Sequence, residues 1–221
     1  MPVFNEAATV ERAVAAALTA DLGVARELVI VDDGSTDGTR ERLTADAWPA
    51  EVTVLLHERN QGKGAAVRTA LAEARGEFAA ILDADLEYDP RDLARLLAPL
   101  LDGRTDAVFG VRAFEGHTSH SFLYVLGNRF VTLVANVLFN VYIADLMTCH
   151  KVIRTKLFRS LPLRCRGFDI EAEIAARLVQ RGQRIYEFPV SYEARIEGKK
   201  LTWRDGLRVV GTLVRCRLTA G

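Results

Sequence analysis

The first half of the chain alternates short apolar segments with segments of helical pattern, and this alternation limits the fold more than any other feature. Apolar runs of strand length predict strands at 28–31, 52–56, 78–82 and 107–111. Helical patterns separate them, after Asn5 and at 35–43, 63–75 and 89–101. Such alternation predicts an α/β fold, with a mostly parallel sheet, right-handed crossovers and helices on both faces. At 221 residues the chain is long enough to bury the core of a single domain.

The second half is less regular. An apolar stripe at helical spacing consists of Phe130, Leu133, Val134, Val137, Leu138 and Val141. We predict a packed amphipathic helix here; a helix that also contacts lipid or a partner is the alternative, because amphipathicity alone does not separate the two. Further on, 169–181 predicts a helix and 185–190 a strand. A final helix is marked by Trp203, Leu207, Val210 and Val214.

Charge composition excludes one class of partner. Lys plus Arg and Asp plus Glu both number 29, so the chain has no overall basic field and we expect no nucleic-acid binding. From Arg195 onward, however, the sequence contains seven basic residues and only two acidic ones. The final helix is therefore expected to present a polarised surface, suited to lying on an anionic membrane face or to packing on the sheet with its arginines in water.

Cysteine spacing and hydropathy indicate the compartment. Cys149, Cys165 and Cys216 are an odd set without a Cys-x-x-Cys motif, which argues against a disulfide framework and a zinc site. The most apolar stretch, 130–144, is shorter than a bilayer span and contains two asparagines. We predict a cytoplasmic protein, peripheral on the membrane face, without a spanning segment or a leader.

Two acidic clusters follow predicted strands. Asp32 and Asp33 end one apolar run, and Asp83 and Asp85 end another. The carboxyl ends of parallel strands open onto the ligand crevice of an α/β sheet. Asp83, Asp85 and Glu87 therefore supply oxygen ligands suited to Mg²⁺ or Mn²⁺, which share their coordination with substrate phosphates.

Two other motifs have rival interpretations. The acidic loop that begins at Asp33 resembles a calcium-binding loop, but its twelfth position is Thr44 and a strand precedes it, so we reject calcium. Gly62 and Gly64 suggest a dinucleotide fingerprint, but Val67 occupies the third glycine position and no Ser or Thr follows Lys63. We expect these glycines to form a close turn into a helix whose N-terminus faces an anion.

Taken together, the motifs resemble those of a known family. The motifs are residues 2–6 (PVFNE), 31–37 (VDDGSTD), 60–64 (NQGKG), 83–85 (DAD), 110–112 (GVR), 145–151 (DLMTCHK), 187–192 (EFPVSY) and 195–200 (RIEGKK). They resemble the successive signatures of inverting family-two glycosyltransferases of GT-A fold, and their spacing resembles the bacterial dolichol-phosphate mannose synthase-like branch. The resemblance covers essentially the whole chain.

The resemblance implies a site. Pro2, Phe4, Glu6 and Asp32 would hold the base and ribose of a nucleotide sugar, and Asp33, Gly62, Lys63, Asp83 and Ala84 would complete the donor site. Asp85 would be the principal metal ligand, with Asp83 and Glu87 as further ligands. Arg112, Arg129, Arg195 and Lys200 match basic positions that gather donor and acceptor phosphates; solvated surface charge is the alternative for each of them. Phe4 stands where the family often has Tyr, and Lys199 where it usually has Ser.

The resemblance also implies an organisation and a reaction. Residues 1–115 would bind the donor, GDP-mannose or UDP-glucose, and 116–221 the acceptor. Only Met1 precedes Pro2, so we expect most of the family's first strand to be missing. A polyprenyl phosphate acceptor is already anionic and needs no general base, whereas a sugar hydroxyl needs one, for which the candidates are Asp145, Asp169 and Glu171. The expected reaction is therefore transfer of a hexose, mannose or glucose, to a polyprenyl phosphate. The alternatives are a glycosyltransferase that acts on a sugar hydroxyl in cell-surface polysaccharide or glycoconjugate synthesis, and a non-catalytic nucleotide-sugar-binding protein.

Overall fold

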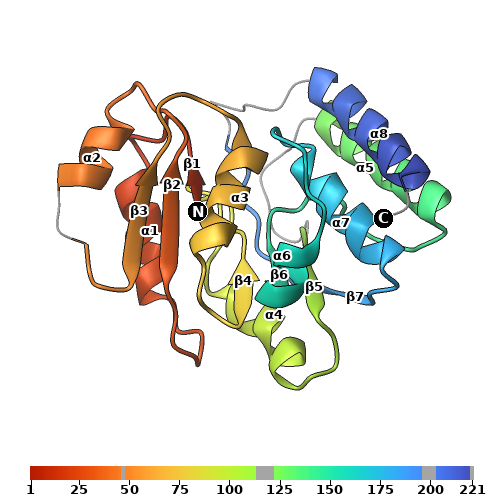
Figure 1. The fold of residues 1–221 in the computed structure, drawn as a ribbon, viewed down its shortest axis with the longest axis horizontal. Coiled ribbons are helices and arrows are strands. Elements are labelled where there is room, and N and C mark those ends of the chain that lie inside the picture. Colours follow the sequence, from red (N-terminus) through yellow and green to blue (C-terminus); the bar gives the residue numbers. More distant parts are fainter. Residues whose placement is uncertain (46–47, 113–121, 196–202, 220–221) are drawn as a thin grey trace.

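A computed structural model of the chain describes residues 1–45, 48–112, 122–195 and 203–219. It has two sheets that lie next to each other, with helices around them (Figure 1). The first sheet contains β1 (Pro2–Val3), β2 (Leu28–Asp32) and β3 (Val52–Leu56). The second contains β4 (Phe78–Ala80), β5 (Ala107–Arg112), β6 (Lys151–Arg154) and β7 (Ile185–Val190). The α/β class is thus confirmed.

Strand directions follow the prediction for most of the structure. β1, β2 and β3 are parallel, as are β5 and β7. β6 runs antiparallel to both β4 and β5 in the order β4-β6-β5-β7, and the sequence analysis did not predict this strand. It has four residues, of which only Val152 and Ile153 are aliphatic, so its pattern is too short to stand out.

Helices cover the sheets and form the far end of the molecule. Along the first half these are α1 (Val10–Thr19), α2 (Thr39–Ala45), α3 (Lys63–Glu73) and α4 (Asp92–Leu101). The second half contributes α5 (Phe122–Phe139), α6 (Thr155–Ser160), α7 (Ile170–Gln180) and α8 (Trp203–Leu218). Helices α5 and α8 lie side by side at one end, next to α7 (Figure 1).

The predicted packing of α5 is wrong in part. Val131 and Ala135 face the core, but Phe130, Leu133 and Val137 of the predicted stripe are exposed. The error arises because α5 is apolar on more than one side, so the sequence does not mark which side packs. No helix in the described ranges is long and apolar enough to span a membrane.

Strand β1 has only two residues, as expected. It pairs with β2 at Val31 and Asp32, so that Pro2 and Val3 end beside the acidic end of β2. This arrangement brings the loop after β1 next to the loop after β2, which is the foundation of the site described next.

Candidate active site

The loops that follow β1 and β2 are joined by hydrogen bonds. The Asn5 amide donates to Ser35 Oγ at 2.9 Å, and the Thr36 amide donates to Asn5 Oδ1 at 2.9 Å. Asn5 itself has a φ of 51°, a left-handed conformation that Asn tolerates better than most residues. The Glu6 amide donates to Thr39 Oγ1 at 2.8 Å. These contacts fix the buried Glu6 side chain at the mouth of the first sheet.

Asp33 holds the glycine turn that precedes α3. Its carboxylate accepts from the amides of Gln61 at 2.9 Å and Gly62 at 2.7 Å, and it contacts His57 Nδ1 at 2.7 Å. Gly62 has a φ of 96°, and a Cβ atom there would lie 2.3 Å from the Arg166 carbonyl oxygen. The close turn was therefore predicted correctly, and it requires glycine.

The N-terminus of α3 is occupied by the protein itself. The amides of Gly64 and Ala65 donate to the Arg166 carbonyl oxygen at 2.7 and 3.3 Å. Because these two amides already have an acceptor, they are not available to the anion that the sequence analysis expected there.

A buried chain of alternating charges starts from Lys63. Its Nζ lies 2.7 Å from Asp83 Oδ2 and 3.0 Å from Glu171 Oε1. The other Glu171 oxygen lies 2.8 Å from Lys151 Nζ. Burial alone would raise the pKa of Asp83, but the charge of Lys63 and its hydrogen bond lower it. Asp83 is therefore an ionised carboxylate at neutral pH.

Arg195 gathers three carboxylates around it. Its guanidinium lies 2.9 and 3.0 Å from the two oxygens of Glu6, and 3.5 Å from Asp85 Oδ2. The Arg195 amide donates to Glu87 Oε1 at 3.0 Å. The Glu6 contact is bidentate, which is the geometry that fixes a guanidinium most firmly. Residues from the two ends of the sequence thus meet at one point.

Asp85 lies in the most negative part of this cluster. Burial, and then the charges of Asp83 and Glu87, raise the pKa of Asp85 to about 7, against the smaller opposing effect of Arg195. The local excess of negative charge is what a divalent cation would neutralise. Two carboxylates together with substrate phosphates are a usual ligand set for Mg²⁺, so Asp83 and Asp85 fit such an ion.

Glu87 has other partners. It accepts from the Tyr192 hydroxyl at 2.8 Å as well as from the Arg195 amide. Among the residues that the structure describes, no three His, Cys, Asp or Glu side chains converge as a metal-binding group. Glu87 thus supports the loop around Arg195, and its assignment to the metal stays a prediction.

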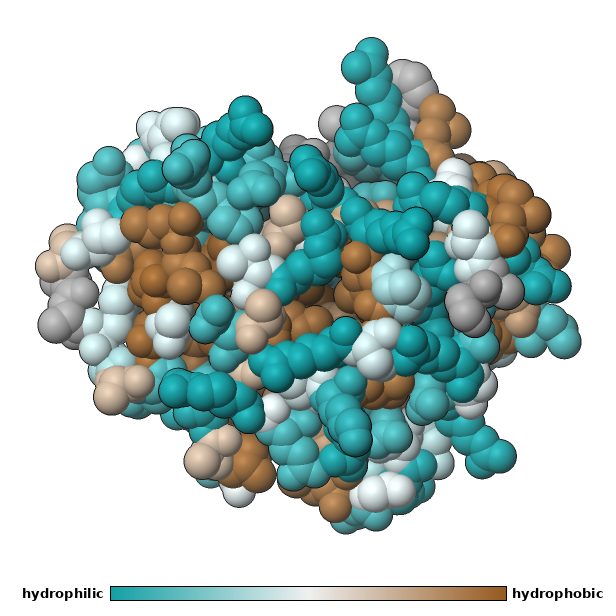
Figure 2. Space-filling view, viewed as in Figure 1, coloured by the Kyte–Doolittle hydropathy of each residue, from teal (hydrophilic) through white to brown (hydrophobic). Residues whose placement is uncertain are grey.

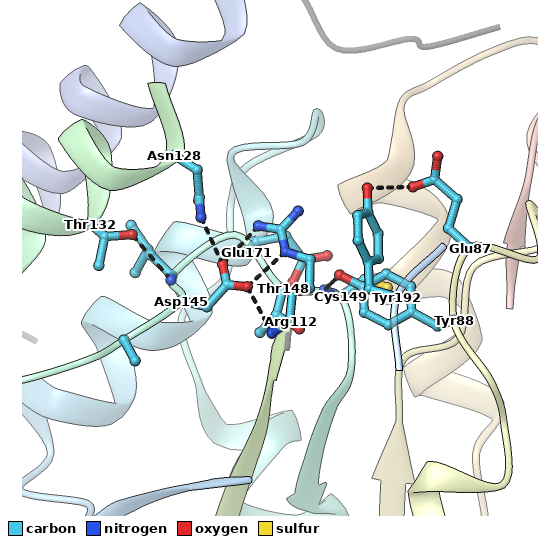
Figure 3. A network of polar contacts seen from close by, with 12 residues as sticks. Glu87, Tyr88, Arg112, Asn128, Thr132, Asp145, Thr148, Cys149, Glu171 and Tyr192 are labelled. Atoms are coloured by element: carbon cyan, nitrogen blue, oxygen red, sulfur yellow. Dashed lines mark hydrogen bonds and ion pairs between the residues drawn. The ribbon is translucent and has the colours of Figure 1, made fainter. Parts of the chain in front are cut away.

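Arg112 and Asp145 form a second buried ion pair (Figure 3). Arg112 Nε and NH2 lie 2.7 Å from the two Asp145 oxygens, and Asn128 of α5 donates to Oδ1 at 3.0 Å. Although burial opposes ionisation, the Arg112 hydrogen bond and charge keep the pKa of Asp145 below its usual value. A carboxylate held in this way is a weak general base.

Aromatic rings connect the two ion-paired clusters. The Arg112 guanidinium lies 5.2 Å from the centre of the Tyr192 ring, and Tyr192 packs against Tyr88 at 5.1 Å. Tyr88 stacks on His150 at 4.5 Å. Burial raises the pKa of the Tyr192 hydroxyl, which therefore stays protonated and donates to Glu87. Figure 3 shows Tyr192 between Arg112 and Glu87.

The remaining predicted site residues lie in different settings. Pro2 and Phe4 are half-buried at the start of the chain, and Ala84 is buried. Asp32 is fully buried and lies 2.8 Å from an Arg40 nitrogen. Arg129 is exposed on α5, one residue after Asn128. Lys200 lies outside the described residues.

The alternative bases are also accounted for. Glu171 lies between Lys63 and Lys151, and Asp169 accepts from Thr212 of α8 at 2.8 Å. The sequence analysis assigned no role to the side chains of Tyr88, Tyr192 and Lys151. Tyr88 directly follows the acidic cluster, which was the available signal; Tyr192 and Lys151 follow no comparable pattern.

The fold resembles solved structures. Glucosyl-3-phosphoglycerate synthase from Mycobacterium tuberculosis, in complex with Mn²⁺, uridine-diphosphate and phosphoglyceric acid, matches with a TM-score of 0.77 at 20% identity. The match covers 98% of this chain and 76% of that chain. The same synthase with Mn²⁺, uridine-diphosphate-glucose and glycerol 3-phosphate also gives a TM-score of 0.77, at 22% identity. The chain therefore has the GT-A fold of this synthase.

The family is shown by sequence. The chain belongs to Glycosyl transferase family 2, whose sequence model matches residues 1–161. Glycosyltransferase AglJ of Haloferax volcanii is 33% identical over 199 residues, covering 89% of this chain and 63% of AglJ. Undecaprenyl-phosphate 4-deoxy-4-formamido-L-arabinose transferase of Pseudomonas aeruginosa is 40% identical over 120 residues. That match covers 51% of this chain and 34% of the relative, so the chain spans less than two thirds of both proteins.

Proposed function

We propose that the protein is an inverting glycosyltransferase that moves a hexose, mannose or glucose, from a nucleotide-diphosphate sugar to a polyprenyl phosphate. The observation that carries this proposal is the state of the candidate bases. Asp145 is paired with Arg112, Glu171 with two lysines, and Asp169 accepts a hydrogen bond from Thr212 of α8. A sugar hydroxyl would need one of these carboxylates to take its proton, whereas a phosphate acceptor is ionised near neutral pH and needs none.

The donor half supports the departure of a nucleoside diphosphate. Asp83 and Asp85 would hold Mg²⁺ or Mn²⁺, which would stabilise the negative charge that develops on the leaving diphosphate. Arg195 lies beside Asp85 and brings a further positive charge to the same place. Glu6 holds the guanidinium of Arg195 in a bidentate contact, so its orientation is set before substrate arrives.

The acceptor half supports binding of an anion. Arg112 is oriented by Asp145 and the Tyr192 ring, and only part of its surface reaches solvent. The Arg112 guanidinium lies against the Tyr192 ring, and Glu87 accepts hydrogen bonds from both the Tyr192 hydroxyl and the Arg195 amide. We infer that they receive the acceptor phosphate near the anomeric carbon, since arginine binds phosphate through two parallel hydrogen bonds. The name of the P. aeruginosa relative, an undecaprenyl-phosphate sugar transferase, agrees with such an acceptor.

A surface formed by α5 and α8 supports a lipid substrate. Large apolar residues on the outer side of α5 are exposed at a spacing of one helix face: Phe122, Leu126, Phe130, Leu133 and Val137. On α8, Leu207, Val214 and Leu218 are exposed beside Arg204, Arg208, Arg215 and Arg217. Apolar side chains are visible among hydrophilic ones at this end of the molecule (Figure 2).

Such a surface has the chemistry of a helix pair that lies on an anionic membrane. The apolar side chains would enter the lipid boundary, and the arginines would contact lipid phosphates. We therefore propose that the protein works on the cytoplasmic face of a membrane, from which a polyprenyl phosphate reaches Arg112.

The test is transfer to defined acceptors. Purified protein would be incubated with Mn²⁺, radiolabelled GDP-mannose or UDP-glucose, and either undecaprenyl phosphate or a free sugar. We expect radiolabelled sugar from one of the two donors to be transferred to undecaprenyl phosphate, and the label therefore to move into the organic phase. Transfer to the free sugar alone would show that the acceptor is a sugar hydroxyl, and would overturn the proposal of a polyprenyl phosphate acceptor. Nucleotide binding without turnover of either donor would favour a non-catalytic binding protein.

A further inference from the structure

The two carboxylates that would hold the metal ion each have a positively charged neighbour. Asp83 Oδ2 lies 2.7 Å from Lys63 Nζ, and Asp85 Oδ2 lies 3.5 Å from a nitrogen of the Arg195 guanidinium. Binding of a divalent cation to these carboxylates therefore brings it close to two existing positive charges. The side chains of Asp83 and Asp85 are only 21% and 19% exposed, so solvent screens the repulsion only in part.

The two neighbouring cations are held in different ways. Lys63 is nearly buried, and its ammonium also lies 3.0 Å from Glu171 Oε1, so it is fixed between two carboxylates. The Arg195 side chain is 27% exposed, and its short hydrogen bonds, at 2.9 and 3.0 Å, both run to Glu6. Its contact with Asp85 is longer than either of these. Arg195 therefore stays beside Asp85 because Glu6 holds it there, and the Asp85 contact itself is the weaker one.

The charge of Arg195 opposes a metal ion that arrives alone. Asp85 Oδ1 accepts from the Glu87 amide at 3.1 Å, whereas Oδ2 faces the Arg195 guanidinium. A metal ion and the guanidinium therefore compete for the same carboxylate. Because Glu6 keeps the guanidinium in place, its positive charge remains near the ion even when the Asp85 contact is given up. A free ion should thus bind more weakly than it would beside an uncharged side chain.

A nucleoside diphosphate reverses the sign of this effect. Its phosphates carry more negative charge than one divalent ion balances, so the complex of ion and nucleotide is an anion as a whole. The guanidinium of Arg195 attracts such a complex, and arginine donates parallel hydrogen bonds to phosphate oxygens. The same side chain therefore repels the ion alone and attracts the ion that arrives with its nucleotide.

We propose that Arg195 makes binding of the metal ion depend on the nucleotide: it weakens binding of the ion alone and strengthens binding of the ion together with a nucleoside diphosphate. The inference rests on the donor site of the proposed function and adds its regulation. Because coupling between two ligands is reciprocal, the ion must tighten nucleotide binding by the same factor as the nucleotide tightens ion binding. The site thus selects the complex of ion and nucleotide over either one alone.

The experiment separates the charge of Arg195 from its structural contact with Glu6. Arg195→Gln removes the charge but retains a hydrogen-bond donor, whereas Arg195→Lys retains the charge but loses the bidentate contact. Arg91→Gln, at an exposed arginine paired with Asp89, is the control. Electron paramagnetic resonance of unbound Mn²⁺ measures the affinity of each protein for the ion, alone and with saturating UDP or GDP. A purely structural role of Arg195 would affect the Gln and Lys variants alike.

Arg195→Gln is expected to bind Mn²⁺ alone about tenfold more tightly than the parent, and Mn²⁺ with nucleotide less tightly, which is the usual range of coupling between two ligands. Arg195→Lys and Arg91→Gln should bind Mn²⁺ alone as the parent does. Adding Asp85→Asn to Arg195→Gln should abolish the gain. Unchanged or weaker binding of Mn²⁺ alone by Arg195→Gln, an equal gain in the Lys variant, or a gain that survives Asp85→Asn would overturn the proposal.

The parent protein provides a test that does not depend on the folding of any variant. Its affinity for Mn²⁺ should rise about tenfold when UDP or GDP is present, and equal affinity with and without a nucleotide that binds would overturn the proposal. Absence of nucleotide binding by the parent would instead count against the proposed function. The affinities for Mn²⁺ alone would still decide whether Arg195 opposes the ion, so the two failures are distinguishable.

Discussion

Arg195 contacts Asp85 at 3.5 Å although 110 positions separate the two residues in the sequence. The contact places a permanent positive charge against the carboxylate whose pKa is raised to about 7. Because Glu6 and Glu87 also contact Arg195, a single guanidinium offsets the repulsion among three acids. The site is therefore short of positive charge until substrate and ion bring their own, and the first two predictions follow from this.

Replacing Asp85 with Asn should weaken nucleotide binding. The substitution keeps the shape of the side chain and removes its charge, so affinity for UDP or GDP with Mn²⁺ should fall tenfold or more, about 1.4 kcal/mol, toward the value in chelator. Asp89→Asn, which alters a carboxylate paired with exposed Arg91, is the matched control. Isothermal titration calorimetry with and without Mn²⁺ measures the nucleotide affinity of both variants. Equal affinity of the Asp85 variant and the parent would show that Asp85 does not hold the metal ion.

Replacing Arg195 with Ala should reduce transfer strongly. It removes the charge beside Asp85 and leaves the buried Glu6 carboxylate without this partner, so we expect a cost of about 2–4 kcal/mol in kcat/KM. Arg195→Lys should recover only part of the loss, because an ammonium does not reproduce the bidentate contact. Arg91→Ala, on an exposed arginine, should be nearly silent. If Arg195→Ala were as active as Arg91→Ala, Arg195 would have no role in transfer.

Replacing Asp145 with Asn distinguishes a positioning residue from a base. Asn can still hold Arg112 through one hydrogen bond, so transfer to undecaprenyl phosphate should remain within about tenfold of the parent, a loss of about 1.4 kcal/mol. The pH profile of kcat should keep its shape, since no proton is taken by this side chain. A loss far beyond tenfold, with an acidic limb missing from the pH profile of the residual activity, would show that Asp145 is a base, and would favour a hydroxyl acceptor.

The amine of Met1 should make stability depend on pH. Its pKa is about 5 in the folded chain and near 8.0 when unfolded, so between these values the unfolded state binds more protons and stability rises with pH. An N-acetylated chain lacks this effect. The free energy of unfolding of the acetylated protein should therefore exceed that of the parent, by an amount that grows about 1.4 kcal/mol per unit as the pH falls from 8 to 5.

Urea denaturation of both proteins at several pH values measures this difference. The raised pKa of Asp85 makes stability fall as the pH rises, which is the reverse of the effect of the amine. This contribution is the same in both proteins, so it cancels in the difference. Asp83 and Lys63, which face the amine, are likewise unchanged. A constant difference over this pH range would show that the amine is not buried.

Replacing Phe130 and Val137 together with Ser should reduce membrane binding. Both side chains are exposed on the outer side of α5, so the folded core should be unaffected. Binding to vesicles of phosphatidylcholine with phosphatidylglycerol should fall at least fivefold, and the parent should bind poorly without the anionic lipid. Leu56→Ser, an exposed leucine on β3, is the control. Sedimentation with vesicles measures the binding of the parent, the double variant and the control. Unchanged binding of the double variant would show that this surface does not bind the membrane.

The sequence predicted the elements with strong periodicity and missed those set by tertiary contacts. β2, β3, β5 and β7 agree with their predicted segments within a residue at each end. The helix predicted from residue 35 begins at Thr39, because Asp37 accepts from the Thr39 amide and ends the loop there. α4 begins at Asp92 rather than at the Asp89–Pro90 pair.

In the candidate site, the sequence indicated where the carboxylates lie close together, but not which basic side chains pair with them. Asp83 and Asp85 follow a strand, so their place at a sheet edge could be predicted. The partners Lys63 and Glu171 for Asp83, and Glu6 for Arg195, come from distant segments, and no local pattern specifies such pairs. The outward face of α5 could not be chosen either, because apolar residues surround the helix.

The contact between Glu6 and Arg195 spans 189 positions, nearly the length of the chain. During synthesis, Glu6 leaves the ribosome long before Arg195 is made, so this contact cannot form until β7 and the residues after it have been made. Closing so long a loop costs entropy that local contacts do not repay, which makes this one of the last contacts to form on refolding. Recovery of nucleotide binding should then lag behind recovery of secondary structure, and that delay would report directly on the arrival of Arg195.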